Sequence, residues 1–270
     1  MIPADARRRA AVLGSPIAHS LSPVLHRAAY AALRLDWSYD AVEVDEAALP
    51  GFVAGLDGSW AGLSLTMPLK EAVLPLLAEV DDLARALRSV NTVLPSSEGW
   101  RGTNTDVDGI VESLRRIGAG EASSATVLGG GATARSAVAA LARLDVPVVT
   151  VCARRPDAAD EVADLSRALG VADVGTSSLQ PDTVLVAADI VISTLPGDVG
   201  GGWAEVAATA GRGALLDASY HPWPTPLATA WPTTRVASGR DMLLWQAVRQ
   251  VELMTGRPAP VEAMAAALPD

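Results

Sequence analysis

The chain has 270 residues, half of them hydrophobic and 19% charged, which indicates a folded protein long enough for two lobes. The formal net charge of −10 argues against nucleic acid as a partner. Cys152 is the single cysteine, so we expect no internal disulfide, no cysteine-based metal site and a reducing, cytoplasmic location. No run approaches the roughly 20 apolar residues of a membrane helix, so we expect no membrane association.

The predicted elements alternate between strands and helices from the start of the chain. Residues 10–13 form a short apolar run before a loop, and residues 39–44 and 63–67 have the pattern of two further strands. Ser22 and Pro23 precede an amphipathic stretch, which predicts a helix with Ser22 as its N-cap and Pro23 in its first turn. This alternation is typical of an α/β sheet with crossover connections.

A dinucleotide-binding pattern lies in the middle of the chain. The apolar run 126–128 leads into a glycine-rich turn and an alanine-rich helix, and the turn matches G-x-G-x-x-A. The first glycine permits a tight turn, and the helix N-terminus offers N–H groups and partial positive charge to a pyrophosphate. The predicted cofactor-binding residues of this turn are Gly129, Gly130, Gly131, Ala132, Thr133 and Ala134.

The end of the next strand distinguishes between the two nicotinamide cofactors. The strand at 148–152 runs into Ala153, Arg154 and Arg155, where an NAD site usually carries an acidic residue. Two guanidinium groups at this place suit the 2′-phosphate of NADP. We therefore predict NADP as the cofactor, with these three residues in its site; the alternative is a solvated turn.

Two lobes account for the order of the elements. Further apolar runs at 189–194 and 214–217 complete a Rossmann-type, doubly wound NADP-binding domain, predicted for residues 109–239. Residues 1–108 are predicted to form an α/β substrate-binding domain. The C-terminal helices, within residues 240–270, are expected to pack back on this first lobe and complete it.

The basic residues of the chain are strongly biased. Arginine occurs 20 times, whereas Lys70 is the single lysine. A chain with this bias would carry arginine wherever a surface charge suffices, so Lys70 is expected to supply a property that arginine lacks. That property is a proton that can be exchanged near neutral pH.

Five polar segments, followed in order along the chain with the glycine-rich turn among them, resemble the shikimate dehydrogenase family over nearly the whole sequence. They are residues 19–23 (HSLSP), 64–70 (SLTMPLK), 90–92 (VNT), 104–106 (NTD) and Gln246. The resemblance implies reversible reduction of 3-dehydroshikimate to shikimate by NADPH, in the biosynthesis of chorismate and the aromatic amino acids. It also implies that Lys70 and Asp106 are the catalytic pair, which exchanges a proton while the nicotinamide exchanges a hydride. Asp106 also has the position of a helix N-cap, and the two roles are compatible.

The resemblance also implies the residues around the substrate. Ser20, Ser22 and Tyr220 are placed at the ring carboxylate, and Thr66, Asn91 and Gln246 around the hydroxyl groups, where neutral donors and acceptors suit a polyol. Lys70 and Asp106 complete the predicted substrate-binding set. Ala218 and Gly239 are placed against the nicotinamide. No metal is expected, because the three histidines lack a shared ligand spacing.

Some features depart from the family pattern and leave alternatives open. Ser64 stands where many relatives have asparagine, residues 153–155 read Ala-Arg-Arg instead of Asn-Arg-Thr, and Asp241 replaces a smaller residue. The alternatives are a quinate or aminoshikimate dehydrogenase of the same family and a non-catalytic dinucleotide-binding sensor. A cyclohydrolase-type folate dehydrogenase has similar lobes, but the serine loop and residues 104–106 argue against it. A monomer and a homodimer are both compatible with the sequence.

Overall fold

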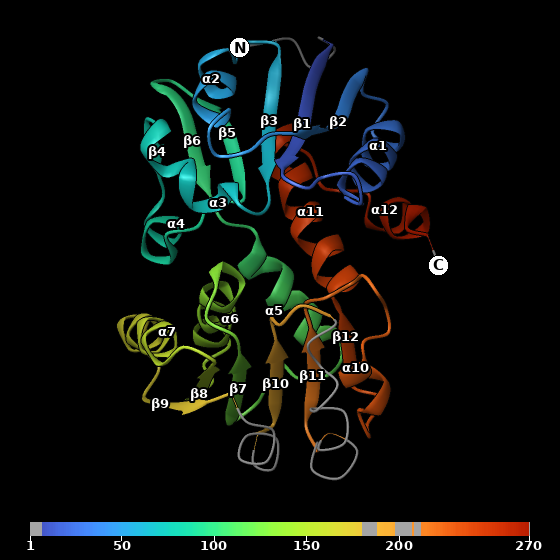
Figure 1. Cartoon of the computed structure of the whole chain (residues 1–270). Coiled ribbons are helices and arrows are strands. Elements are labelled where there is room, and N and C mark those ends of the chain that lie inside the picture. Colours follow the sequence, from blue (N-terminus) through green and yellow to red (C-terminus); the bar gives the residue numbers. More distant parts are fainter. Residues whose placement is uncertain (1–6, 180–187, 198–206, 208–211, 270) are drawn as a thin grey trace. The chain divides into compact units, whose positions relative to one another are not determined.

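Figure 1 shows the computed structural model of the chain, which describes residues 7–179, 188–197, 207 and 212–269. The chain divides into two compact units, the first formed by Met1–Thr105 with Gln246–Asp270 and the second by Asp106–Trp245. The described residues of each unit form a six-stranded sheet with helices, so the predicted two-domain α/β fold is confirmed. No helix within the described ranges is long and apolar enough to cross a membrane.

The first unit is built on a mixed sheet with strand order β2-β1-β3-β5-β6-β4. β1 pairs in parallel with β2 and β3, whereas β5 is antiparallel to both β3 and β6. The strands are β1 (Arg8–Gly14), β2 (Trp37–Glu43), β3 (Trp60–Leu65), β4 (Glu79–Val80), β5 (Thr92–Ser96) and β6 (Gly99–Thr103). The helices are α1 (Ser22–Ala32), α2 (Leu49–Ala54), α3 (Leu69–Ala72), α4 (Asp82–Leu87) and α12 (Val261–Ala267), with a 3-10 turn at Leu74–Leu76.

Helix α1 begins differently from the prediction. Its N-cap is Leu21, whose backbone is already helical, and no side chain caps the first turn. Ser22 is therefore the first residue of the helix and not its N-cap, although Pro23 does lie in the first turn as predicted. The hydroxyl of Ser22 is consequently not used to cap the N-terminus of the helix.

The C-terminal helices complete the first unit. Helix α11 (Gly239–Thr255) reaches this unit from Gln246 onward, and α12 packs against α1. Tyr30 of α1 is buried, and its hydroxyl lies 3.8 Å from the sulfur of Met254 in α11. The prediction that the C-terminal helices pack on the first lobe is therefore confirmed.

The second unit is a doubly wound parallel sheet with strand order β9-β8-β7-β10-β11-β12. The strand order reverses between β7 and β10, which is the switch point at which such sheets bind ligands. The strands are β7 (Ser124–Leu128), β8 (Val148–Ala153), β9 (Asp173–Ser178), β10 (Ile190–Ser193), β11 (Ala214–Asp217) and β12 (Val236–Ser238). The described helices besides the start of α11 are α5 (Asp106–Arg116), α6 (Ala132–Arg143), α7 (Pro156–Ala168) and α10 (Pro226–Ala230).

Candidate functional site

The polar segments of the first unit gather at one edge of its sheet. The serine loop follows β1 and residues 66–70 follow β3, and these strands are parallel, so both segments leave the sheet at the same edge. Asn91 precedes β5, which is antiparallel to β3, and residues 104–105 follow β6, which is antiparallel to β5. Four separate segments therefore meet at the carboxyl ends of β1 and β3, where α/β sheets bind their ligands.

The serine loop is tied to the core of the unit through a buried tyrosine. Ser22 is 5% exposed, and its hydroxyl is hydrogen-bonded to Tyr39, whose pKa is raised by burial. The hydroxyl of Tyr39 donates to Ser64 Oγ at 2.6 Å. Ser20 lies beside this link, with its Oγ 3.4 Å from the backbone nitrogen of Ser22.

Lys70 is held by its backbone in a short helix. The segment before it continues the pairing of the sheet, because the backbone N–H of Thr66 donates to Leu13 O at 2.9 Å. Lys70 is the second residue of α3, and its carbonyl accepts from the N–H of Val90 at 2.8 Å. The backbone of Lys70 is thus fixed against the segment that carries Asn91.

The two Asn-Thr pairs, at residues 91–92 and 104–105, are connected by hydrogen bonds. The buried Asn91 accepts at Oδ1 from the N–H of Thr105 and from the hydroxyl of Thr92, both at 2.8 Å, and its Nδ2 donates to Thr105 Oγ1 at 3.0 Å. Asn104 anchors the second motif, since its Nδ2 donates to the carbonyl of Ser89 at 2.8 Å. Asp106 follows Thr105 directly as the first residue of α5 and is 4% exposed.

The sequence prediction missed one residue at this edge of the sheet. Gln246, predicted to bind substrate, is 6% exposed in α11, and Gln250 lies one turn later on the same helical face. The side chain of Gln250 is buried and reaches both Asn91 and Thr92. The signal that was available is a second glutamine four residues after the first, within a helix that is otherwise apolar on this face.

The glycine-rich turn of the second unit has the geometry that a pyrophosphate requires. Gly129 has a φ of +123°, and a Cβ on it would lie 2.1 Å from Thr194 Oγ1, so another residue would strain the turn. A Cβ on Gly130 would lie 2.8 Å from that of Ala158 in α7, whereas one on Gly131 would meet nothing within 4 Å. Gly131 is also the N-cap of α6, with no side chain capping it. The space beside this helix N-terminus therefore fits an anion.

The rest of this turn and the arginine pair lie at the same edge of the second sheet. Residues 132–134 form the first turn of α6, and Ala153 ends β8, the strand next to β7. Arg154 and Arg155 follow and are both exposed. Arg155 lies 3.6 Å from the carboxylate of Asp157, whereas Arg154 forms no ion pair with any residue that the structure describes.

Ala218 and Gly239, both predicted to contact the nicotinamide, are adjacent in the structure. They follow the parallel strands β11 and β12, and the N–H of Gly239 donates to Ser219 O at 3.2 Å. A Cβ on Gly239 would lie 2.2 Å from the carbonyl oxygen of Ala218, so only glycine allows this approach. Tyr220 follows two residues after Ala218, and burial raises the pKa of its phenol.

Asp217 holds both ends of the segment that carries Tyr220. This carboxylate is 1% exposed, accepts from the N–H of Ser219 at 3.2 Å and from Thr225 Oγ1 at 2.6 Å, and has a pKa raised by burial. Thr225 in turn caps α10 by accepting from the N–H of Ala228 at 3.0 Å. The proline-rich segment is therefore closed into a loop by one buried carboxylate.

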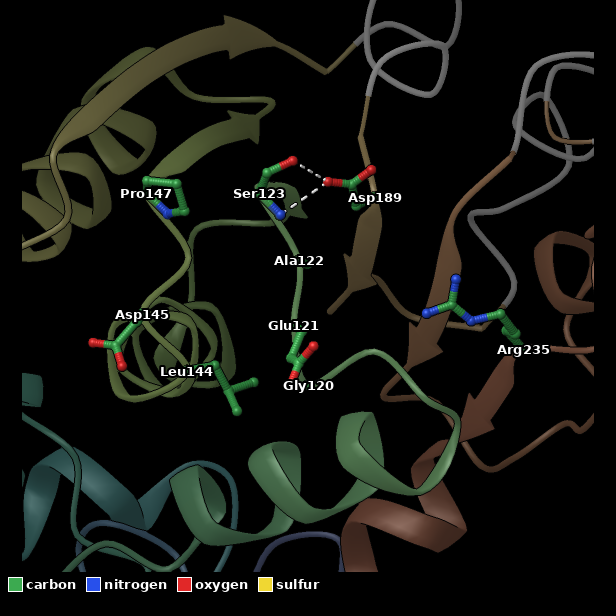
Figure 2. Close-up of a pocket in the computed structure, with 9 residues that line it drawn as sticks. All are labelled: Gly120, Glu121, Ala122, Ser123, Leu144, Asp145, Pro147, Asp189 and Arg235. Atoms are coloured by element: carbon green, nitrogen blue, oxygen red, sulfur yellow. Dashed lines mark hydrogen bonds between the residues drawn. The ribbon is translucent and has the colours of Figure 1, made fainter.

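A pocket of about 680 Å³ lies at the opposite end of the second sheet (Figure 2). Its lining includes Ser123, Pro147, Asp189 and Arg235, which directly precede β7, β8, β10 and β12. The carboxylate of Asp189 accepts from the N–H and the hydroxyl of Ser123 at 2.9 and 2.6 Å. Because these are the amino ends of parallel strands, this pocket is separate from the glycine-rich turn at their carboxyl ends.

Metal ligands do not cluster in the part of the chain that the structure describes. No group of three or more His, Cys, Asp or Glu side chains there could hold a metal ion. His26 is fully buried against Tyr39, with the two rings stacked at 4.0 Å, and burial lowers its pKa to about 3. His26 therefore belongs to the core of the first unit.

Comparison with known proteins gives matches to both ends of the chain. A family model described as the shikimate dehydrogenase substrate binding domain matches residues 12–93, and one described as the shikimate 5'-dehydrogenase C-terminal domain matches residues 239–268. A curated protein of Anaeromyxobacter sp. (strain Fw109-5), named shikimate dehydrogenase (NADP(+)), is 35% identical over 263 residues. The match covers 95% of this chain and 94% of that protein.

Solved structures are similar along almost the whole chain. The crystal structure of Mycobacterium tuberculosis shikimate dehydrogenase has a TM-score of 0.89 and 45% identity, covering 96% of this chain and 98% of the other. Shikimate 5-dehydrogenase from Thermus thermophilus, solved in complex with NADP(H) and shikimate, has a TM-score of 0.83 and 30% identity. That match also covers 96% of this chain and 98% of the other.

Proposed function

Because the chain belongs to the shikimate dehydrogenase family, we propose that it catalyses the reversible, NADP-dependent oxidation of shikimate to 3-dehydroshikimate, with Lys70 and Asp106 handling the proton. It is an oxidoreductase that acts on a CH–OH group, as its family is. The substrate domain in this proposal is residues 1–108 with 240–270, and the NADP domain is residues 109–239.

The observation that carries the proposal is a frame of hydrogen bonds that joins the segments of Lys70, Asn91 and Asp106 at one edge of the first sheet. The carbonyl of Lys70 is bonded to Val90, the next residue is Asn91, and the side chain of Asn91 is bonded to Thr105. Asp106 follows Thr105 in the chain. A frame of this kind, built from the chain's single lysine and both of its asparagines, supports a role in chemistry more than in folding alone.

Lys70 and Asp106 divide the proton chemistry between them. When the substrate hydroxyl becomes a carbonyl, the neutral amine of Lys70 takes the hydroxyl proton; in the reverse direction the ammonium returns a proton to the carbonyl oxygen. The carboxylate of Asp106 orients the amine and balances the positive charge that forms on it. Bound NADP would supply the acceptor for the hydride that leaves the carbon atom carrying the reacting hydroxyl.

The polar groups of the first unit bind and orient the substrate. Ser20 and Ser22 donate to the ring carboxylate, and Thr66, Asn91 and Gln246 bind the ring hydroxyls. Because no side chain caps this helix, the Ser22 hydroxyl is not used as a cap. Its single hydrogen, directed to Tyr39 in this structure, would turn to the ring carboxylate when the substrate binds.

The second unit supplies one substrate contact and the cofactor site. Burial raises the pKa of Tyr220, so its phenol stays protonated at neutral pH and serves as a donor to the substrate carboxylate. The open space at Gly131 accommodates the pyrophosphate, with residues 129–134 around it, and the Arg154 guanidinium binds the 2′-phosphate. Ala153 and Arg155 border this group, and Ala218 with Gly239 forms the wall for the nicotinamide.

The experiment that tests the function is an initial-rate assay at about 340 nm, the absorbance band of the reduced nicotinamide, with shikimate or quinate and NADP or NAD in all four combinations. A clear preference for shikimate with NADP is expected. Activity with quinate or NAD alone would contradict the proposed substrate or cofactor and would favour the sister activity within the family. No activity in any combination would favour the non-catalytic sensor. For location we propose the cytoplasm, which the single cysteine supports, and cell fractionation tests it.

A further inference from the structure

Gln250 lies at the centre of a buried hydrogen-bond network in the first unit. Its Oε1 accepts from Ser64 Oγ at 2.8 Å and lies 3.1 Å from His26 Nε2. Its Nε2 donates to Thr92 Oγ1 at 2.9 Å and to the carbonyl of Asn91 at 3.2 Å. One amide, 1% exposed, therefore connects α11 with α1, β3 and the start of β5.

The orientation of the Gln250 amide is determined by its partners. The backbone carbonyl of Asn91 can only accept, so the atom of Gln250 that faces it is the nitrogen. The oxygen must then face Ser64 and His26, which both donate to it. The amide therefore has one allowed orientation, and each of its polar atoms has two partners.

This orientation is passed on to the side chain of Asn91. Thr92 Oγ1 accepts from Gln250, so its own hydrogen is directed to Asn91 Oδ1 at 2.8 Å. Asn91 Oδ1 also accepts from the N–H of Thr105, so two donors, Thr92 and Thr105, fix the position of this oxygen. The Nδ2 atom of Asn91 is thereby directed to Thr105 Oγ1. In the other direction, Ser64 accepts from Tyr39 and donates to Gln250, so the Gln250 oxygen also ends a second short chain of hydrogen bonds.

We propose that Gln250 is a positioning residue for substrate binding, which fixes the orientation of the Asn91 amide through Thr92. The inference rests on the proposed function, in which Asn91 binds the substrate. Gln250 itself acts through these residues, so its loss changes how the substrate is held and does not affect the site of NADP. A polar residue that only filled the core would alter stability and leave both Michaelis constants unchanged.

The test compares Gln250→Met with Val251→Ala. The first variant keeps the side-chain volume and removes the amide, while the second removes two methyl groups from the next residue of α11, which is fully buried. We expect Gln250→Met to raise KM for shikimate about 5- to 20-fold, the range for one or two lost hydrogen bonds, with KM for NADP changed less than about twofold. Val251→Ala should lower Tm and leave both KM values unchanged.

A double-mutant cycle shows whether Gln250 acts through Asn91. If it does, Gln250→Met combined with Asn91→Ala should raise KM for shikimate little beyond Asn91→Ala alone, by less than about twofold. Fully multiplied effects, or an unchanged KM in folded Gln250→Met, would overturn the proposal. If Gln250→Met does not fold, Thr92→Val breaks the same link with a side chain of the same shape, and the same two outcomes decide. Absence of shikimate oxidation by the unaltered protein would reject the proposed function instead, before any variant is compared.

Discussion

Arg154→Ala should change the cofactor preference of the enzyme with little effect on its fold. Arg154 is exposed at the end of β8 and has no ion-pair partner among the described residues, so its removal breaks no salt bridge there. In the complex its guanidinium would form a charge-assisted contact with the 2′-phosphate, which contributes about 1.5–3 kcal/mol. At about 1.4 kcal/mol per tenfold, kcat/KM for NADP should fall about 10- to 150-fold.

The matched control is Arg155→Ala. Arg155 lies 3.6 Å from the carboxylate of Asp157, which offsets part of its positive charge, so its loss should lower kcat/KM for NADP less. Both side chains are well exposed, and such pairs contribute at most about 1 kcal/mol to stability, so Tm should change little. Initial rates with NADP and with NAD measure both variants, and thermal unfolding monitors the fold. NAD has no 2′-phosphate, so kcat/KM for NAD should stay within about twofold of the unaltered protein in Arg154→Ala. Equal losses with NADP and NAD would refute the reasoning, because they would place the 2′-phosphate away from Arg154.

Four further substitutions test Lys70, the buried His26 and the glycine-rich turn. Lys70→Ala should lower kcat about 10²- to 10⁴-fold in initial-rate assays with Tm little changed, and near-normal turnover would remove Lys70 from the proton chemistry. Burial lowers the pKa of His26 from 6.5 to about 3 in the folded protein. The contribution of neutral His26 to stability is therefore fully present above about pH 6.5 and is lost progressively as the pH falls toward 3. Urea unfolding at pH 7, 6 and 5 should therefore show a smaller decline for His26→Gln than for the unaltered protein, and equal slopes would contradict this assignment. Gly129→Ala should lower the free energy of unfolding by about 2–4 kcal/mol, whereas Gly131→Ala should lower it by less than about 1 kcal/mol. Gly131→Ala should also raise KM for NADP. Similar free energies of unfolding for the two variants would refute the strain at Gly129.

The parts of the fold that were predicted from the sequence are those that local physics specifies. β7 and the turn after it combine a buried apolar run, glycines and a helix start within about a dozen residues, and the structure has α6 beginning at Ala132 as expected. The polar segments at this edge of the first sheet were identified by their resemblance to a known family, and the strong bias toward arginine gave a separate reason to expect a special role for the single lysine. The roles of these residues remain proposals, whereas their gathering within the first unit is structural.

The parts that were missed depend on contacts between distant residues. β5 contains Pro95, its hairpin with β6 turns through Ser97 and Glu98 without a typical turn sequence, and β9 is largely exposed, so none of these strands has a strong local pattern. Ser22 had a good N-cap sequence, but its hydroxyl bonds to Tyr39, 17 positions further along the chain. The role of Gln250 depends on Ser64 and Asn91, both more than 150 residues away, and periodicity within α11 carries no information on them.

The return of the chain to its first unit has a consequence for folding during synthesis. Thr105 and Gln246 bound a contiguous second unit, so at about 5–20 residues per second the first unit waits roughly 7–28 s for its last segment. Until Gln250 and Met254 arrive, the hydroxyls of Ser64 and Thr92 lack their amide partner and Tyr30 lacks its thioether contact. The second unit, whose residues emerge consecutively, is therefore complete on the ribosome before the first unit has its last segment.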